Sequence, residues 1–418
     1  MSESPNKTTE AEPAHPIRPW SSLLIHDYRL IFTAILCANT ANHMRNVASL
    51  YQVYQLSGSS VQLGLAGFFQ ALPFIFFGLF GGVLADTYNR KRLIVVTHTL
   101  NILPGLILAL LTLTGVIEVW HVNTLNVLAG ALQVLGGPAR QAIIPSLVPQ
   151  SYLLNAVTMT TLMMQGSQLT APVIAGFLID LFGVQASYFV DAALLLPSVI
   201  SVLLIHGSGQ PQGERRRIGW HSLIEGIEFL WHTRIILSLF LLDFFAVLFG
   251  FYRPILPLFA DAVFHVGARG LGMLYAAPAI GALLGSGLLL VFGNVKRKGV
   301  LSVVATLCFA LSLGFLGLSQ WFWMGLIAVG ALGFSDAISV AMRRTVVQIL
   351  APDDMRGRAT SFLTVFAQTT NATGAIIAGA GAALLGASNA ALFGSLLCAL
   401  TVLATCWAIP QLWRYQGD

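Results

Sequence analysis

The segment Gly82-Val83-Leu84-Ala85-Asp86-Thr87-Tyr88-Asn89-Arg90-Lys91-Arg92 is polar and basic at its end, and it joins two long apolar segments, 61–84 and 93–115. Asn89 suits a tight turn there, because asparagine tolerates the positive φ that such a turn can require. Asp86 suits the N-terminus of a helix from elsewhere in the chain, where the helix dipole favours an anion. Basic residues stay on the cytoplasmic side of a membrane. The segment therefore predicts a cytoplasmic loop between two transmembrane helices.

The composition is that of a chain surrounded mainly by lipid. Hydrophobic residues make up 56% of the 418 residues and charged residues only 9%, whereas soluble domains carry about 25% charged residues. So few charges cannot cover a water-facing surface, and most of the chain must face lipid or other apolar helices. The four cysteines lie in apolar runs, which argues against a disulfide framework or a zinc site. We expect no metal and no cofactor.

Twelve segments are predicted to be transmembrane helices, because a span needs about 20 apolar residues. They are residues 30–55, 61–84, 93–115, 122–143, 153–178, 186–206, 235–260, 269–291, 299–318, 321–342, 359–384 and 389–411. Between the sixth and seventh lies a polar linker, 207–234, in which Ile218–Trp231 has apolar residues at helical spacing. This pattern predicts an amphipathic helix lying on the membrane surface.

An internal repeat relates the two halves of the chain. Ala171–Gly176 aligns with Gly374–Gly379, and Leu63-Gly64-Leu65 aligns with Leu271-Gly272-Met273, in the same order and at nearly the same offset. The repeat predicts two pseudosymmetric six-helix bundles with a substrate site between them near the middle of the membrane. We therefore expect an all-α membrane protein whose parts are a cytoplasmic N-terminal tail, an N-terminal bundle, a cytoplasmic linker, a C-terminal bundle and a cytoplasmic C-terminal tail, at residues 1–29, 30–206, 207–234, 235–411 and 412–418.

The positions of Lys and Arg predict the orientation. They cluster in alternate loops, at Arg90/Lys91/Arg92, Arg140, Arg215–Arg217, Lys296/Arg297/Lys298, Arg343/Arg344 and Arg356/Arg358. The opposite loops carry Arg269 beside the acids Glu118, Asp180 and Asp261. Basic residues favour the cytoplasmic side, so both termini are expected there. The net charge of +5 is explained by these loops and does not indicate nucleic-acid binding.

The segment Gly82–Arg92 resembles the cytoplasmic signature G-x-L-A-D-R-x-G-R-[KR] of the major facilitator superfamily. The resemblance implies that this loop latches the two bundles together in one conformation. The latch residues are then expected to be Asp86, Arg90, Arg92 and Arg140. Thr87 stands where the family has Arg, and Asn89 where it has Gly, so one charge of the latch is missing.

Three further segments resemble the branch that holds enterobactin exporters and macrolide efflux pumps: Asn42–Ala48, Gly137–Gln141 and Arg356-Gly357-Arg358. This resemblance covers nearly the whole chain. It implies a monomer in the bacterial cytoplasmic (inner) membrane that exports a drug, a siderophore or a related metabolite. It also implies that export is driven by proton antiport.

The fifth segment, 153–178, resembles the antiporter motif G-x-x-x-G-P-x-x-G-G in degraded form. The matching residues are Gly166, Pro172 and Gly176. Small residues let helices approach closely and proline bends a helix, which suits a pivot near the cavity. Generic helix packing is the alternative. The motif favours export over import, although Gln168 lies where relatives often carry Arg.

Polar groups inside the predicted spans mark the expected site, because such groups are costly within a membrane. We expect the cavity to be lined by Asn42, Arg45, Asn46, Gln133 and Arg253. Asp336 and Asp243 are the expected proton-coupling residues, whereas Asp191 is expected near the membrane surface. The alternative for the polar face of segment 30–55 is hydrogen bonding between helices. The alternative for each charge is a structural ion pair.

The charges also bear on the substrate. Arg45 and Arg253 align in the repeat, and two guanidinium groups facing one cavity would favour an anion such as a carboxylate, catecholate or phosphate. A lipid or lysophospholipid flippase on the same fold is an alternative function, and a polytopic membrane enzyme is another. The enzyme is disfavoured because the charges are scattered singly, and the chain has neither H-E-x-x-H nor a phosphate-binding glycine-rich loop. No catalytic residue is therefore expected.

Overall fold

The computed structural model describes residues 18, 20–210, 234–293, 297–350 and 356–409. Within these residues the chain forms helices and no β-strand. Several predictions lie outside the described residues: the N-terminal tail up to residue 17, the amphipathic helix at Ile218–Trp231, Arg215–Arg217 and the tail 412–418.

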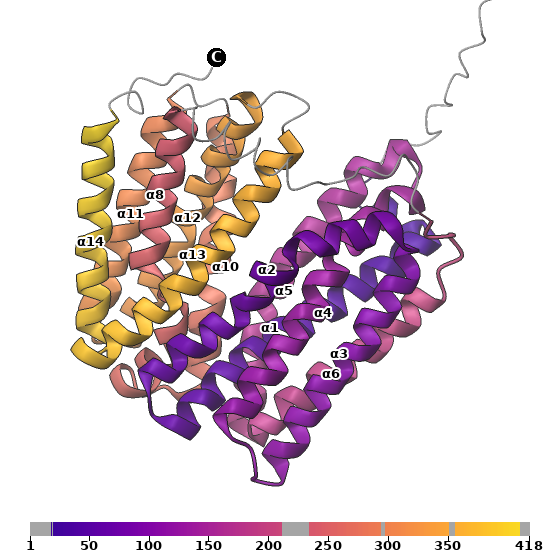
Figure 1. The fold of residues 1–418 in the computed structure, drawn as a ribbon, viewed down its shortest axis with the longest axis horizontal. Coiled ribbons are helices and arrows are strands. Elements are labelled where there is room, and N and C mark those ends of the chain that lie inside the picture. The colour runs from indigo at the N-terminus through magenta and orange to yellow at the C-terminus, as the bar shows by residue number, and fades with distance from the viewer. Residues whose placement is uncertain (1–17, 19, 211–233, 294–296, 351–355, 410–418) are drawn as a thin grey trace, which may run out of the picture.

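The first group of helices follows the chain from residue 26 to residue 203. It consists of α1 (His26–Ser57), α2 (Ser60–Thr87), α3 (Arg90–Leu113), α4 (Val119–Leu147), α5 (Leu153–Phe182) and α6 (Val184–Leu203). Helix α1 lies inside the group and contacts α4, α5 and α6, and α3 packs on α4 and α6. Figure 1 shows this group as the indigo to magenta half of the molecule.

The second group contains the remaining helices. It consists of α8 (Arg234–Gly250), α9 (Leu256–Leu258), α10 (Gly267–Phe292), α11 (Lys298–Leu318), α12 (Phe322–Leu350), α13 (Arg356–Leu385) and α14 (Ala387–Ala408). Helix α12 packs on α10 and α11, and α14 packs on α8, α11 and α13. Each predicted span overlaps one of the long helices of the two groups.

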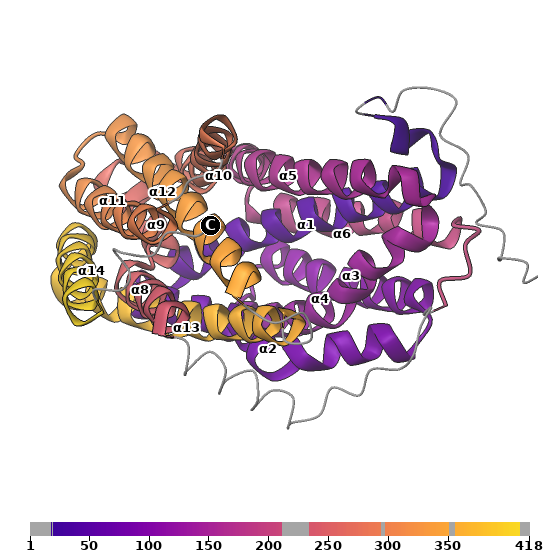
Figure 2. The ribbon, with the colours of Figure 1, turned by 90° about the horizontal axis from the view of Figure 1, so that it is seen from above.

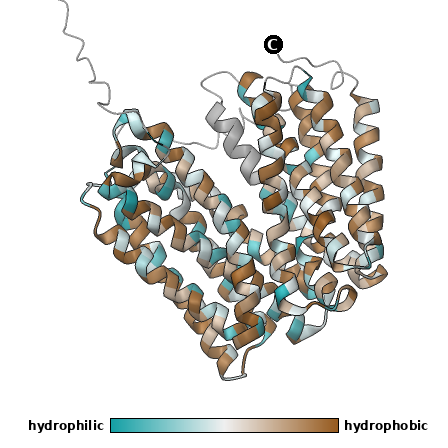
Figure 3. Cartoon of the chain, turned by 180° about the vertical axis from the view of Figure 1, so that it is seen from behind, coloured by the Kyte–Doolittle hydropathy of each residue, from teal (hydrophilic) through white to brown (hydrophobic). Residues whose placement is uncertain are grey.

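Ten segments of the described chain are long and apolar enough to cross a membrane. Helices α1 and α13 are not among them, so length and composition alone do not reach the predicted twelve. Both helices place polar side chains in the central cavity described below, and these lower the mean hydropathy. Many large apolar side chains along the helices are exposed, for example Phe76, Leu284 and Trp407. Figure 3 shows that apolar residues predominate along the helices of both groups.

The repeat is visible in the backbone at the turns after α5 and α13. Gly183 has φ 83° and ψ 169°, and Gly386 has φ 80° and ψ 161°. Only glycine adopts this conformation without strain, because a Cβ atom would clash with the backbone. The offset between these glycines is the one that aligns Ala171–Gly176 with Gly374–Gly379. The two halves therefore make the same turn with the same residue.

The predicted span 235–260 is not one continuous helix. Helix α8 ends at Gly250, and the chain continues through a 3-10 turn at Arg253–Ile255, the short α9 and a π-helical turn at Phe259–Val263. Pro254 explains the break, since proline has no N–H to donate to the carbonyl of Gly250 and its ring would clash with that carbonyl in a continuous α-helix. The break brings residues 251–254 into the middle of the molecule, where a broken helix is tolerated if it lines a cavity.

The two groups touch closely along α2 with α13 and along α5 with α10 (Figure 2). A Cβ atom on Gly64 would lie 2.7 Å from the carbonyl oxygen of Ala375, and one on Gly379 would lie 2.6 Å from the Cα atom of Gly64. A Cβ atom on Gly176 would likewise lie 3.1 Å from the Cα atom of Gly272. These glycines permit backbone contact between the groups, and the repeat relates the two contacts.

Candidate functional site

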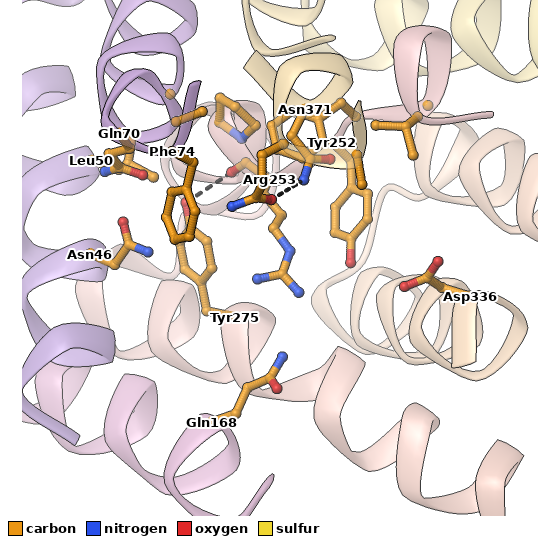
Figure 4. Close-up of a pocket in the computed structure, with 18 of the residues that line it drawn as sticks. Asn46, Leu50, Gln70, Phe74, Gln168, Tyr252, Arg253, Tyr275, Asp336 and Asn371 are labelled. Atoms are coloured by element: carbon orange, nitrogen blue, oxygen red, sulfur yellow. Dashed lines mark hydrogen bonds between the residues drawn. The ribbon is translucent and has the colours of Figure 1, made fainter. Parts of the chain in front are cut away.

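A cavity of about 440 Å³ lies between the two groups of helices. One wall comes from α1, α2 and α5, and the other comes from α8, the break after it, α10, α11, α12 and α13. Figure 4 shows Arg253 in the middle of this space, between Tyr275 and Tyr252, with Asp336 on the α12 side and Gln168 on the α5 side. The site is therefore built from both halves of the repeat.

The charged groups of the cavity come from the second group of helices: Asp243, Arg253, Asp336 and Arg343. Asp243 and Arg343 form an ion pair between α8 and α12. Among the described residues, neither Arg253 nor Asp336 has an ion-pair partner within 4.0 Å. A cationic guanidinium and a separate carboxylate therefore both face the space in which a ligand would lie.

The break after α8 holds Arg253 in place through its backbone. The hydroxyl of Tyr275 on α10 donates a hydrogen bond of 2.8 Å to the carbonyl oxygen of Arg253. In a continuous α-helix that carbonyl would accept from the N–H of residue 257, which is a proline and has none; here it also accepts from the backbone N–H of Leu256. The guanidinium can then project into the cavity from a fixed backbone position.

Neutral groups complete the lining. Amide, imidazole and aromatic side chains surround the charges: His43, Asn46, Gln70, Phe74, Gln168, Phe251, Tyr252, Tyr275, Phe309, Gln368 and Asn371. The Nδ2 atom of Asn371 donates to Oε1 of Gln368 at 3.0 Å. Aromatic walls with a few polar groups are typical of small-molecule sites, where the polar groups set orientation and specificity. The arrangement suits a polar molecule with an aromatic or apolar body.

Three of the predicted site residues lie elsewhere in the molecule. Arg45 is buried inside the first group, where its Nε and Nη2 atoms donate to the two carboxylate oxygens of Asp191 at 2.6 and 2.9 Å. Its Nη1 atom donates to Oδ1 of Asn101 at 2.7 Å. Asn42 and Gln133 are also absent from the lining of the central cavity. Of the predicted cavity residues, the structure thus brings Asn46 and Arg253 together.

The ion pair between Arg45 and Asp191 differs from what the sequence predicted for both residues. Arg45 was expected to face the cavity, but its side chain turns toward α3 and α6 because a carboxylate and an amide there satisfy its donors. Asp191 was expected near the outer end of its helix, close to water, yet its exposed fraction is 0%. A buried, bidentate pair of this kind leaves neither charge available for a ligand.

The loop after α2 differs from its expected geometry. Asn89 has φ −59°, not a positive φ, and it caps α3 by accepting a hydrogen bond of 3.1 Å from the backbone N–H of Arg92. Its Nδ2 atom donates to the carbonyl oxygen of Ser208 at 2.6 Å, and Nη1 of Arg90 donates to the carbonyl oxygen of Ala142 at 2.9 Å. Ala142 is on α4 and Ser208 is at the start of the linker, so neither partner belongs to the second group of helices.

The other expected latch residues also lack a partner in the second group among the described residues. Asp86 and Arg92 are exposed and form no ion pair in that part of the chain. The Nη1 atom of Arg140 lies 3.2 Å from Nε2 of His98, inside the first group. In this conformation the loop is thus held to its own half of the molecule.

The residues of the helix 5 motif divide between two places. Pro172 lines the central cavity. Gly176 packs against α10, whereas a Cβ atom on Gly166 would meet nothing within 4 Å. The motif therefore adjoins both the cavity and the contact between the two groups.

Sequence reasoning missed the contribution of α13. Gln368 and Asn371 line the cavity and are hydrogen-bonded one helical turn apart. The signal was present, because two amides three residues apart within a predicted span form a polar face. The same rule that selected Asn46 would have selected them.

The chain matches the family model described as transmembrane secretion effector over residues 17–413. It is 27% identical over 380 residues to the enterobactin exporter EntS of Shigella dysenteriae serotype 1 (strain Sd197), covering 90% of this chain and 91% of that protein. The same identity and coverage hold for enterobactin exporter EntS of Escherichia coli O81 (strain ED1a).

Solved transporter structures share the fold. The POT family transporter PepTSo gives a TM-score of 0.73 at 13% identity, covering 94% of this chain and 99% of that one. Nucleoside transporter NupG gives 0.72 at 13% identity, covering 93% and 100%. A bacterial homologue of the human lysosomal transporter Spinster, inward-facing and unoccupied, gives 0.70 at 16% identity, covering 96% and 100%. The chain therefore belongs to the transmembrane secretion effector family, within the major facilitator superfamily of transporters.

Proposed function

We propose that this protein exports an anionic small molecule, such as a siderophore or a related metabolite, by proton-coupled alternating access. The observation that carries the proposal is Arg253, whose guanidinium faces the central cavity without a carboxylate in ion-pair contact among the described residues. A cation inside a membrane protein attracts anions strongly, because the surrounding dielectric is low. The similarity to enterobactin exporters supports export of a siderophore-like compound.

The proposed architecture is twelve spans in two six-helix halves, 30–206 and 235–411, in a monomer of the bacterial inner membrane. Helices α1 and α13 are the two polar spans, and His43 and Asn46 of α1 and Gln368 and Asn371 of α13 line the transport cavity. The basic loops support a cytoplasmic position for both termini and the linker 207–234. With that orientation the glycine contacts lie toward the outer side, and the cavity loads from the cytoplasm.

Coupling to protons is assigned to Asp336, because Asp243 is already paired with Arg343. In antiport the proton and the substrate occupy the transporter alternately, so Asp336 releases its proton to the cytoplasm before the substrate binds and takes up a proton from the outer side after the substrate has left. The inward proton gradient can then drive export of the substrate.

The test is transport into inverted membrane vesicles from a strain lacking the native gene and expressing this chain. We expect uptake of a catecholate siderophore that depends on a pH gradient in the wild type and is lost in Asp336→Asn. Asp180→Asn is the control, because Asp180 pairs with Arg269 on the surface at 2.6 Å. Gradient-driven uptake by Asp336→Asn at the wild-type rate would contradict the coupling, and failure of the wild type to move any anion would contradict the function.

A further inference from the structure

A second cavity, of about 380 Å³, lies inside the second group of helices, between α8, α11, α13 and α14. Its walls are almost entirely apolar and include Leu313, Ile377, Leu384, Phe393 and Leu397. No charged side chain is among the residues that line it. It is therefore unlike the central cavity in the chemistry that it offers.

The space arises from small residues on facing helices. Ala378 and Gly381 on α13 lie opposite small residues on α14, which are Ala390, Ala391 and Gly394. A Cβ atom on Gly381 would approach only the Cβ atom of Ala390, at 3.7 Å, which is an ordinary van der Waals distance. The room is thus left by the absence of side chains, and a larger residue at 381 would enter it.

The rim of this cavity is on the surface that faces lipid. Leu384 is 84% exposed and Phe393 is 53% exposed, and both contribute to the lining. Helix α14 is one of the segments that is apolar enough to cross a membrane. Water needs polar partners to occupy a cavity stably, and these walls offer almost none. A hydrocarbon chain from the bilayer is the abundant molecule that matches such walls.

The second cavity shares a wall with the central one. Gly250, Phe251 and Tyr252 line both cavities. Gly250 is the last residue of α8, and Phe251 and Tyr252 connect it to Arg253. A group that fills the second cavity would therefore pack against the back of the break that carries Arg253. Close packing there would restrict the motion of the break.

We infer that one acyl chain of a bilayer phospholipid occupies this second cavity and supports the break between α8 and α9. The chain enters from the membrane between α13 and α14, past Leu384 and Phe393, and ends against Phe251. This binding site is independent of the proposed export activity, and its test requires no transport.

The experiment uses the purified full chain in vesicles of phosphatidylethanolamine and phosphatidylglycerol that contain a trace of phosphatidylcholine with a diazirine at the end of one acyl chain. Irradiation attaches the chain to nearby residues, and mass spectrometry of peptides locates the attachment. We expect labelling of cavity residues such as Leu313 in the wild type and its loss in Gly381→Leu. Labelling of Trp407, which is 87% exposed, should be unchanged in both proteins.

Gly287→Leu on α10 is the matched control, because a Cβ atom there would meet nothing within 4 Å and Gly287 does not line the cavity. It should keep the cavity labelling. Ala378→Leu fills the same cavity from another position and serves if Gly381→Leu does not fold. Equal cavity labelling in wild type and both filled variants would overturn the inference, as would wild-type labelling confined to the surface. Displacement of the label by a cavity ligand, but not by excess phospholipid, would assign the space to the exported molecule instead.

Discussion

Replacing Asp191 with asparagine should destabilise this protein far more than a single polar substitution usually does. The change preserves the shape of the side chain but removes the charge that pairs with Arg45 at 2.6 and 2.9 Å. Both residues are buried, at 3% and 0% exposure, so the guanidinium would remain away from water with Asn101 as its main partner. Removing one partner of a buried pair costs about 3–5 kcal/mol.

A comparison within the same chain sets the scale. Asp180→Asn breaks the pair with Arg269, which is formed on the surface, and exposed pairs contribute only about 0–1 kcal/mol. The double variant Arg45→Met with Asp191→Leu removes both charges and should recover most of the loss, since an apolar replacement of a buried pair is often neutral. Stability would be measured as unfolding by SDS in mixed micelles. The affinity of each variant for a cavity ligand would be measured separately.

The result that would refute this reasoning is specific. If Asp191→Asn unfolds like the wild type while Arg45→Gln changes the affinity for a ligand, then Arg45 faces the substrate. The ion pair would then not be the structural element described above. If instead stability falls and the affinity of the remaining folded protein is unchanged, the pair supports the fold of the first group.

Three other outcomes follow from the structure and the proposed function. A membrane-impermeant thiol reagent on intact cells should label Ser57→Cys but not Ser208→Cys, and the reverse pattern would contradict the orientation. Gly64→Leu should separate α2 from α13, because its side chain would meet backbone atoms of α13 within 3 Å. Labelling of Ser57→Cys should then become faster, and an unchanged labelling rate would contradict the contact. Lowering the pH should weaken binding of the exported anion, because the proton and the substrate bind alternately in antiport, and Asp336→Asn should remove this dependence. If the pH dependence survives in that variant, another group carries the proton.

Much of the fold was predictable because lipid imposes simple constraints on a sequence. Every long helix overlaps a predicted span, and the repeat marks positions such as Gly183 and Gly386 that adopt the same backbone conformation. The break after Gly250 was not predicted, although Pro254 was a sufficient signal for it. Hydropathy averages over such a break, because all its residues except Arg253 are apolar or aromatic.

The direction of each polar side chain was harder to predict than its place along a helix. Arg45 and Asn46 are neighbours in sequence, yet one lies inside the first group and the other lines the central cavity. A helix turns by about 100° per residue, so the partner on the adjacent helix decides which polar residue is enclosed. That partner, Asp191, lies on α6, 146 residues after Arg45. The two residues meet only through the packing of the folded chain.

The central claim, that Arg253 makes the cavity selective for anions, is tested most directly by ligand binding to purified wild type, Arg253→Gln and Arg253→Lys. The ligands are three compounds of matched size that carry a carboxylate, an amide or an ammonium group, with Arg269→Gln as a surface control. A charge-assisted contact contributes about 1.5–3 kcal/mol, so Arg253→Gln should weaken carboxylate binding by about 10- to 100-fold. Arg253→Lys should lose less, and binding of the amide should hardly change. Equal affinity of the wild type for all three compounds, or carboxylate binding by Arg253→Gln as tight as by the wild type, would contradict the claim.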